Sequence, residues 1–341
     1  MPQAYMEETG LEGTGPERTG SGARHFLSRE REQWTSPGIW RRGVIVAAVA
    51  VLLALLMLLH ADIPNKVGNL GSLTETFLPW LGLLIPVLFG LALLRRSATA
   101  LIALLLPAVI WLNLFGGLLS DKSGKGGDLT VATHNVNAQN PDPAATARAL
   151  AASGADVVAL EELSDASRYE RAMADTYKYH AVHGTVGVWS KYPLSDDRPV
   201  DIQMGWTRAL RATVQTPRGP VAVYVAHLPS VRVKFNAGFT AGQRDNSAAA
   251  LGRAIAREPV RKVVLLGDLN GTMNDRSLAP VTSQLRSAQG AAGDGFGFSW
   301  PASFPMARID QIMVRGVDPV SAWTLPATPS DHLPVAARVK V

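Results

Sequence analysis

The chain has 341 residues, enough for about two units of ordinary domain size. It contains no cysteine, which excludes disulfide scaffolds, thiolate zinc sites and cysteine nucleophiles, so any metal must be held by oxygen or imidazole ligands. The net charge of +5 is small for a nucleic-acid-binding protein, and most of it lies beyond residue 120, where 24 Lys and Arg face 20 Asp and Glu. That excess is compatible with an anionic substrate, although it is more often an ordinary solvated surface.

The first 120 residues contain a polar tail and three long apolar runs. Residues 1–38 have too few large apolar residues to offset the entropy of ordering, so we expect a disordered cytoplasmic tail. The apolar runs that follow are Gly43–Ala61, Phe77–Leu94 and Ala98–Leu119. Each is close to the roughly 20 residues that a helix needs to cross a bilayer, and almost no polar residue interrupts them. The sequence therefore predicts a three-span transmembrane region over residues 39–120.

Pairs of arginines predict the orientation of these spans. Arg41 and Arg42 precede the first span, and Arg95 and Arg96 fill the tight turn between the second and the third. Because cytoplasmic loops are enriched in Lys and Arg, both pairs belong in the cytoplasm, although two lysines just after the third span weaken this argument slightly. Three spans then place everything after Leu119 on the far side. We therefore expect a multi-pass protein of the cell membrane with a cytoplasmic N-terminus and an extracytoplasmic C-terminal domain.

Beyond a short flexible linker at residues 121–127, strand-like segments alternate with helix-like ones. The strand candidates are Leu129–Asn135, Asp156–Glu161, Val186–Ser190, Ala209–Thr216, Val221–Leu228, Lys262–Leu266, Arg308–Val314 and Val335–Val341. The helix candidates are Ala144–Ala152, Asp165–Ala174, Asp245–Arg257 and Arg276–Gln284. Many strands with few helices predict a two-sheet α/β sandwich over residues 128–341 rather than a doubly wound sheet.

Polar residues able to bind a metal recur just past the ends of these strands. They are His134, Asn135, Asn137, Glu161, Glu162, His227, Asp268, Asn270, Asp310, Asp331 and His332. Strand ends on one rim of a sandwich converge in space, so these carboxylates, amides and imidazoles are expected to form one cluster. An oxygen-rich cluster of this kind suits Mg²⁺.

The order of these motifs resembles the endonuclease/exonuclease/phosphatase superfamily over essentially all of residues 128–341. The matching elements are, in order, an Asn, a Glu, Tyr-Pro, a His, Gly-Asp-x-Asn, Arg-Ile-Asp and Ser-Asp-His-x-Pro. The resemblance implies a four-layered α/β sandwich and metal-dependent hydrolysis of phosphate esters, with Mg²⁺ or Mn²⁺ as the cofactor. It also implies that the metal ligands are Asn135, Glu162 and Asp331, with His134 and Glu161 as neighbouring candidates.

The resemblance further implies a role for each catalytic residue. His227 matches the histidine that contacts the scissile phosphate. Asp268 and Asn270 match the pair that orients the attacking water and hydrogen-bonds the phosphoryl group. Asp310 matches the aspartate that holds the catalytic His332, although a glutamine follows it where an aromatic is usual. These roles agree with the chemistry, because hydrolysis of a phosphate ester needs an activated water and neutralisation of the charge that moves to the leaving oxygen.

The arrangement of three spans before such a domain narrows the resemblance. Together with the stretches THNVN, HLPSVR and GDLNGT, it closely resembles a small group of bacterial membrane phosphatases associated with teicoplanin resistance. That resemblance implies hydrolysis of a lipid-carrier pyrophosphate used in cell-wall synthesis, undecaprenyl pyrophosphate or a precursor carrying it. The alternatives are an externally anchored nuclease or a sphingomyelinase-like phosphodiesterase, and the weak positive charge is thin support for nucleic acid. A non-catalytic binding domain would require decay of the site.

Several other residues allow more than one interpretation. The loop Pro229–Gly242 contains aromatics and cations that suit contact with an anionic interface, but a mobile surface loop explains them equally well. Arg244 opens a predicted helix and could either reach a phosphate or face solvent. His180 and His183 lie in or beside a tyrosine-rich stretch and are expected to be packing or surface residues.

Overall fold

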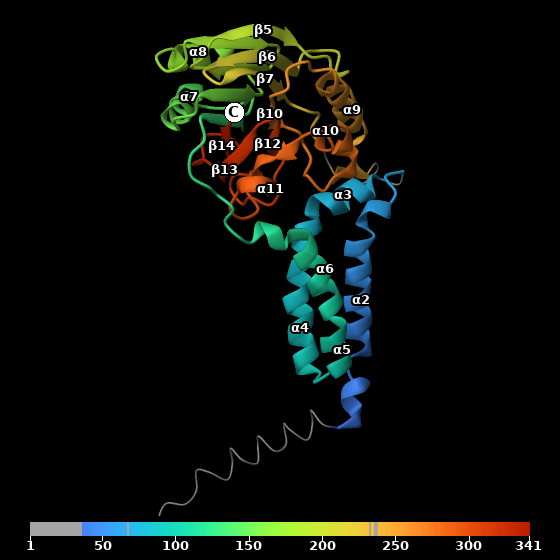
Figure 1. The fold of residues 1–341 in the computed structure, drawn as a ribbon. Helices are drawn as coiled ribbons and strands as arrows, with labels where there is room; N and C mark the ends of the chain where they lie inside the picture. The colour runs from blue at the N-terminus through green and yellow to red at the C-terminus, as the bar shows by residue number, and fades with distance from the viewer. Residues whose placement is uncertain (1–35, 67, 232, 235–237) are drawn as a thin grey trace, which may run out of the picture.

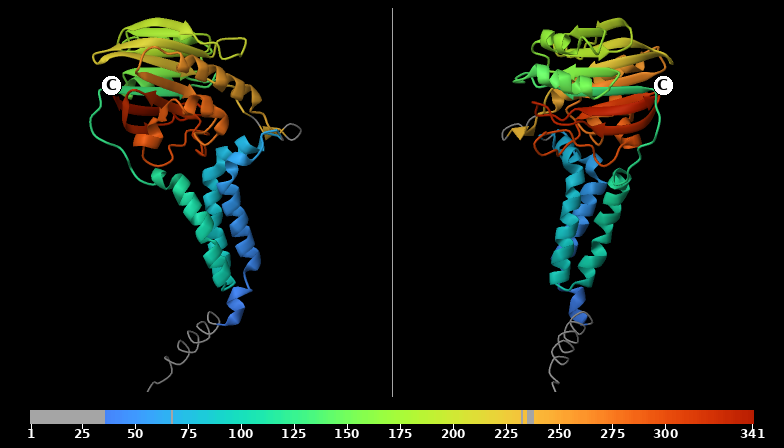
Figure 2. Two further views of the ribbon diagram at one scale, coloured as in Figure 1. Left: turned by 45° about the vertical axis from the view of Figure 1, so that its right-hand side comes forward. Right: turned by 90° about the vertical axis from the view of Figure 1, so that its left-hand side faces the viewer.

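The computed structural model describes residues 36–341 apart from 67, 232 and 235–237. A bundle of helices stands against a domain of two β-sheets, and the arrangement is the same in all three views (Figures 1 and 2). Nearly all of the predicted disordered tail, residues 1–38, lies outside the described residues. The same holds for Arg232 and Phe235 in the predicted interface loop.

The N-terminal region is helical over almost its whole described length. Its elements are η1 (Pro37–Trp40), α2 (Val44–Leu58), η2 (His60–Asp62), α3 (Leu70–Phe77), η3 (Leu78–Leu83), α4 (Leu84–Leu94), α5 (Ala98–Ala103), α6 (Leu105–Phe115) and η4 (Gly116–Leu118). Within the described residues, three continuous helical stretches are long and apolar enough to cross a membrane, Gly38–Leu58, Leu70–Leu94 and Ala98–Leu118. The second begins at Leu70 rather than at the predicted Phe77, because α3 carries polar side chains that are buried against the sheet domain.

The outer surface of the bundle is apolar, whereas its interior contains several small residues. Ile45, Leu58 and Leu94 are among the large side chains exposed on the outside, and Ala50 and Ala92 are fully buried between the helices. Small residues at helix contacts and apolar residues outside them are typical of membrane bundles, because lipid surrounds the outer surface. The three helical stretches are therefore candidate membrane spans.

Both arginine pairs lie at the end of the bundle away from the sheet domain. The carbonyl of Trp40 accepts a hydrogen bond from the Thr99 hydroxyl over 2.8 Å, which brings the start of the first span beside the start of the third. In Figure 1, α5 and the turn before it lie at the lower end of the bundle, opposite the sheets. This placement agrees with the expected orientation, in which the arginines are cytoplasmic and the sheet domain is not.

Reporter fusions would test this orientation. A reporter that is active only outside the cytoplasm should be active when fused after Val341 or, in a truncated chain, after Gly71. The same reporter fused after Arg96 should be inactive, because the Arg95–Arg96 pair is expected to keep that turn in the cytoplasm. The activity of the reporter is divided by the amount of fusion protein in the membrane. An inactive Val341 fusion that is stably expressed would contradict the predicted topology.

The C-terminal domain contains two mixed six-stranded sheets. The strand orders are β13-β14-β1-β2-β4-β3 and β11-β12-β10-β7-β6-β5. The first sheet comprises β1 (Leu129–Asn135), β2 (Val157–Glu161), β3 (Tyr179–His183), β4 (Val186–Ser190), β13 (Asp318–Thr324) and β14 (Val335–Lys340). The second comprises β5 (Leu194–Pro199), β6 (Ala209–Thr216), β7 (Gly219–Ala226), β10 (Val263–Asp268), β11 (Arg286–Ser287) and β12 (Asp310–Arg315). A small separate hairpin pairs β8 (Val233–Lys234) with β9 (Gly238–Phe239).

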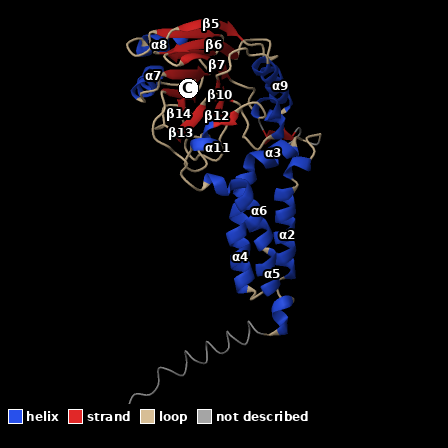
Figure 3. Cartoon of the chain, viewed as in Figure 1, coloured by secondary structure: helices blue, strands red, loops and turns tan. Residues whose placement is uncertain are grey.

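Helices cover the outer face of each sheet (Figure 3). They are α7 (Pro143–Ala152), α8 (Ala166–Met173), α9 (Gly242–Ala256), η5 (Arg276–Leu278) and α10 (Ala279–Thr282). A further helix, α11 (Ala288–Ala292), lies against the edge strands of both sheets and places Ala288 in the core between them. One apolar core fills the space between the sheets, and two others pack α7 and α8 on the first sheet and α9 and α10 on the second. The predicted two-sheet, four-layered α/β sandwich preceded by three apolar helices is therefore confirmed.

Local differences from the predicted elements have simple causes. The strands β3 and β5 were not predicted because they are sheet edges, where polar and exposed side chains remove the alternation that marks a half-buried strand. The predicted helix Arg276–Gln284 is two short pieces, η5 and α10, with Pro280 near the start of the second.

Candidate active site

The predicted site residues gather where strands of both sheets end at one rim of the sandwich. In the first sheet, β1 and β2 run parallel, and their last residues, Asn135 and Glu161, are partners in the register. In the second sheet, Asp268 at the end of β10 is the antiparallel partner of Asp310 at the start of β12. The strand register therefore brings polar residues from distant parts of the chain together.

The side chain of Asn135 joins the two sheets at this rim. Its Nδ2 donates hydrogen bonds to Oδ2 of Asp268 over 3.0 Å and to Oε1 of Glu162 over 3.2 Å. Glu162 directly follows β2 with a positive φ of 61°, which is uncommon for a residue with a side chain. Backbone of this kind clusters at functional sites, and here it accompanies a carboxylate turned toward Asn135.

A buried ion pair links His332 to Asp310. Nδ1 of His332 lies 2.9 Å from Oδ2 of Asp310, and the Ser299 hydroxyl donates a second hydrogen bond to the same oxygen over 2.5 Å. Burial alone would lower the pKa of His332, but the carboxylates of Asp310, Asp268 and Asp331 outweigh it and raise the pKa to about 10. His332 is therefore a cation at neutral pH, and its Nε2 lies 3.9 Å from Oδ2 of Asp268.

The second histidine of the site, His227, is neutral, whereas His332 is charged. Its Nε2 lies 3.5 Å from Oε1 of Glu162 and 3.7 Å from Oδ2 of Asp268. Burial, the guanidinium of Arg208 and the charge on His332 lower the pKa of His227 well below its usual value. The site thus holds one charged and one neutral imidazole on either side of the Asp268 carboxylate, which is an arrangement suited to phosphate chemistry.

A cavity of about 460 Å³ opens onto this cluster. Of the predicted residues, its lining includes Asn135, Glu162, Asp268, Asn270, Asp331 and His332, while His227 and Asp310 lie buried behind them. Asn137, which the sequence left undecided, donates from Nδ2 to Oδ1 of Asp331 over 3.0 Å. Asn270 donates from its backbone N–H to Oδ1 of Asp268 over 2.8 Å. The structure therefore brings all eight predicted catalytic and metal-binding residues into one site.

The neighbouring candidates His134 and Glu161 lie away from the cavity. Strand alternation directs His134 to the outer face of the first sheet, where it contacts the Thr328 hydroxyl. Glu161 shares the face of its partner Asn135, between the sheets, and accepts a hydrogen bond from Thr133. Burial lowers the pKa of His134 to about 3 and raises that of Glu161 well above its usual value, so burial disfavours the charged form of each. Neither side chain lines the cavity, so neither is placed to hold the predicted metal there.

Arg244 neither faces solvent nor lines the cavity, the two positions between which the sequence left a choice. Its side chain is completely buried, and Nη2 lies 2.7 Å from carboxylate oxygens of both Asp245 and Asp275. Nη1 donates to the carbonyl of Asn270 over 3.0 Å. Arg244 therefore supports the loop that carries Asn270. The expectation for His180 as a packing residue is consistent with the structure, since its ring stacks on Trp189.

Sequence reasoning missed two residues of this site, Arg208 and Ser299. Arg208 is almost fully buried, and its Nη2 is in hydrogen-bond reach of the His227 ring. Ser299 fixes the carboxylate of Asp310. The sequence signal for Arg208 was its position just before the apolar strand β6. Its contact with His227 could not be predicted, because it depends on the pairing of β6 with β7.

Arg208 is expected to hold the His227 ring in position for the phosphate group of the substrate. Replacing Arg208 with Ala should lower kcat/KM by about 10- to 100-fold, as loss of a charged hydrogen bond does, and Arg208→Lys should restore part of it. The matched control is Arg218→Ala, because that side chain is 68% exposed. Steady-state kinetics of the three variants would check this. Equal kinetics for Arg208→Ala and Arg218→Ala would remove Arg208 from the site.

The oxygen donors at the rim fit a divalent cation. The carboxylates of Glu162 and Asp268 approach the same Asn135 amide, and like charges this close favour a bound cation. Among the described residues, Asp268, Asp310 and His332 also have ligand atoms within 4.8 Å of one another. Asp310 and His332 already bond each other, however, so we assign the cation to the Glu162 side of the cluster.

Residues 132–332, more than half of the chain, match the model of the Endonuclease/Exonuclease/phosphatase family. The chain belongs to this family. Its members are hydrolases, including phosphatases and nucleases, and they are typically dependent on divalent metals. No curated protein matched the chain in a sequence comparison.

Solved structures of this family share the fold of the C-terminal domain. An endonuclease/exonuclease/phosphatase from Beutenbergia cavernae is 20% identical, with a TM-score of 0.50 over 63% of this chain and 72% of that one. A mannosyl-6-phosphatase from Bacteroides thetaiotaomicron is 16% identical, with a TM-score of 0.50 over 63% and 100%. D. rerio TDP2 in complex with a single-strand DNA product is 17% identical, with a TM-score of 0.52 over 62% and 99%. At these identities the similarity shows the fold alone.

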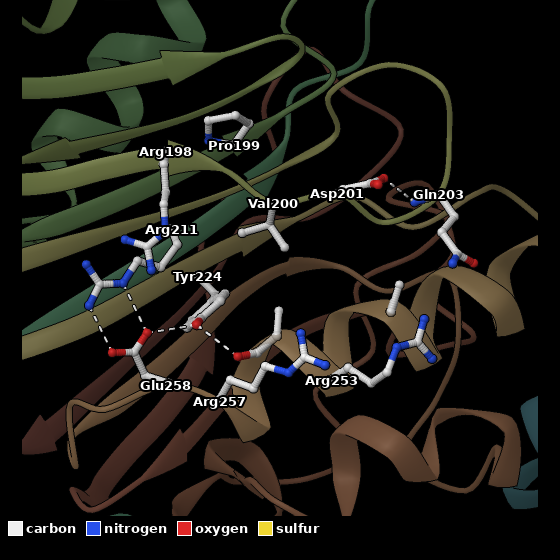
Figure 4. Close-up of a pocket in the computed structure, with 12 residues that line it drawn as sticks. Arg198, Pro199, Val200, Asp201, Gln203, Arg211, Tyr224, Arg253, Arg257 and Glu258 are labelled. Atoms are coloured by element: carbon white, nitrogen blue, oxygen red, sulfur yellow. Dashed lines mark hydrogen bonds and ion pairs between the residues drawn. The ribbon is translucent and has the colours of Figure 1, made fainter.

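A second cavity, of about 400 Å³, lies between the strands β5 to β7 and the helix α9 (Figure 4). Arg211 lies at its base, where Nη2 is 2.9 Å from Oε1 of Glu258. Tyr224 donates to the other oxygen of Glu258 over 2.8 Å. This cavity shares no lining residue with the one at the rim, and its innermost charges are already paired. It therefore stands apart from the site that holds the eight predicted residues.

Proposed function

We propose that this protein is a membrane-anchored, Mg²⁺-dependent phosphoesterase that hydrolyses a lipid-carrier pyrophosphate on the outer face of the membrane. Undecaprenyl pyrophosphate, or a cell-wall precursor that carries it, is the proposed substrate, and its hydrolysis would contribute to resistance of the teicoplanin type. The observation that carries this proposal is the position of the cavity. Thr76 and Phe77, in the second candidate span, line the same cavity as Glu162 and His332.

Each residue of the site has a task in this reaction. Glu162, Asn135 and Asp331 would hold Mg²⁺, which when bound acts as a Lewis acid on a phosphoryl oxygen. Burial raises the pKa of Asp268 to about 7, against the opposing effect of His332, so its carboxylate can accept a proton from the attacking water. The cation of His332 offers its Nε2 hydrogen to a phosphate oxygen.

The neighbouring groups position the phosphate. Neutral His227 can donate a hydrogen bond to an oxygen of the phosphoryl group without adding charge. Asn270 keeps its amide at the site because its Nδ2 donates to the Leu228 carbonyl over 2.9 Å and to Oδ2 of Asp268 over 3.1 Å. No covalent intermediate is required, because the water attacks phosphorus directly.

A comparison of three substrates would test the proposal. The full-length protein, purified in detergent with Mg²⁺, is incubated separately with undecaprenyl pyrophosphate, DNA and sphingomyelin, and the products are quantified. We expect release of phosphate from the lipid pyrophosphate, and a much lower rate with Glu162→Gln prepared in the same way. Faster cleavage of DNA or of sphingomyelin would overturn the proposal in favour of the nuclease or the sphingomyelinase-like alternative.

A further inference from the structure

The active-site cavity has two chemically different walls. One wall carries the polar residues, including Glu162 and His332. The other is mainly apolar and consists of Phe77, Val231, Trp300, Ala307 and Ile309, with Thr76 beside them. Hydrolysis of a phosphate requires only the first wall. The apolar residues that line the same cavity suit a second, hydrocarbon part of the ligand, and the volume of about 460 Å³ is within the range of small-molecule sites.

The membrane region supplies part of the apolar wall and is fixed to the domain by buried polar contacts. In α3, the fully buried Glu75 accepts the backbone N–H of Arg276 at Oε2 over 3.1 Å. Ser72, also buried, donates from its hydroxyl to Oδ1 of Asp275 over 3.1 Å. Asp275 is in turn paired with Arg244, whose Nη1 holds the Asn270 carbonyl. These contacts fix the position of α3, and with it Thr76 and Phe77, relative to the loop that carries Asn270.

Contacts of Trp80 join the second candidate span to the segment of the domain that carries Trp300 and Ala307. Trp80, in the second candidate span, donates from Nε1 to the Met306 carbonyl over 2.7 Å, next to Ala307 of the wall. Its ring stacks on Phe298 at 5.6 Å and packs against Phe304 at 6.4 Å. Phe304 is itself 63% exposed, and exposed aromatics beside a span are typical of a membrane interface.

A smaller cavity of about 210 Å³ lies beside the first, between the helices and the domain. Thr76 lines both cavities, and Pro79, Leu114 and Phe115 line the smaller one from the membrane side. The domain contributes apolar residues such as Phe296, whose ring packs 6.2 Å from that of Phe115. The two cavities therefore adjoin at Thr76, and apolar residues of both the helices and the domain line the smaller one.

We propose that this apolar wall and the adjoining cavity bind the hydrocarbon segment next to the phosphate of a membrane lipid. The ligand class is a phosphate or pyrophosphate monoester of a long aliphatic alcohol, with its head at Glu162 and His332 and its chain leaving beside Phe77. This inference rests on the proposed function and adds to it a site for the lipid. Phe77 and Trp300 are its specificity-determining residues, because they face the first carbons of the chain.

Chain-length selectivity would test the inference. The full-length protein is assayed in detergent with undecaprenyl pyrophosphate and with dimethylallyl pyrophosphate, which has the same head on five carbons. We expect the ratio of kcat/KM, long chain over short, to fall by about tenfold or more in Phe77→Ala, to recover largely in Phe77→Leu and to fall in Trp300→Ala. The matched control is Phe89→Ala, which removes an aromatic ring from the same span at a position 49% exposed. Its ratio should equal that of the wild type.

The outcomes separate the two proposals. A wild-type protein with no preference for the long chain, or Phe77→Ala and Trp300→Ala proteins with unchanged ratios, would overturn the lipid site and leave the pyrophosphatase activity standing. A wild-type protein that hydrolyses neither pyrophosphate would contradict the proposed function itself, and the lipid site with it. If Phe77→Ala fails to fold, Phe77→Leu and Trp300→Ala still report the ratio.

Discussion

Replacing His332 with alanine should remove most of the activity at every pH, by about 10²- to 10⁴-fold, as for other positioned acid–base groups. Asp310→Asn should have a different effect. The carboxylate of Asp310 is 2.9 Å from Nδ1 of His332 and is a main reason why the pKa of His332 is raised to about 10. Without that charge the pKa falls, so the imidazolium is lost at a lower pH. The alkaline limb of the rate profile should therefore move to lower pH, while the rate at acidic pH changes less.

Rate against pH for both variants, with folding checked by thermal melts, would test this. Asp318→Asn is the matched control, because that side chain is 81% exposed and should leave the profile unchanged. If Asp310 were only a structural residue at the start of β12, Asp310→Asn would lower stability and leave the alkaline limb in place. A stably folded Asp310→Asn protein with an unshifted profile would exclude Asp310 from control of His332.

Replacing Glu162 with glutamine should lower activity by roughly 10²-fold or more, because the variant keeps the shape of the side chain but loses the charge that holds Mg²⁺. Raised Mg²⁺ should restore part of the activity, since weaker binding is offset by concentration. Activity measured across a Mg²⁺ titration would show this as a shifted midpoint. Glu170→Gln, a partly exposed residue of α8, is the control and should titrate like the wild type. Full wild-type activity in excess chelator would contradict the metal-dependent mechanism.

Much of the fold could be predicted because the apolar strands carry their own signal. Val263–Asp268 and Ala209–Thr216 are almost entirely buried, and their β-branched runs are visible in the sequence. The edge strand β5 could not be found this way, since its residues are mostly exposed and polar. The polar helix α3 was missed for a related reason. Ser72 and Glu75 interrupt the apolar run, and only the sheet domain that buries them explains why the helix continues.

The candidate site, like the fold, could be predicted only in part. Residues at strand ends could be predicted as a group, because the ends of neighbouring strands meet at one rim. The choice between adjacent residues could not, because a shift of one residue moves a side chain to the other face of a sheet. His134 and Asn135 are neighbours in β1, yet only Asn135 lines the cavity. Arg208 needs the pairing of β6 with β7 before it meets His227.

The contacts of α3 and η3 with the sheet domain restrict movement of that domain about its seven-residue linker. Glu75 with Arg276, and Trp80 with Met306, hold the cavity in a fixed position relative to the candidate spans. An enzyme fixed in this way would meet a lipid substrate by diffusion within the plane of the membrane. Its rate should then follow the mole fraction of substrate in the membrane rather than the amount per volume. Adding inert lipid to reconstituted vesicles should slow the reaction per enzyme, whereas diluting the same vesicles with buffer should not.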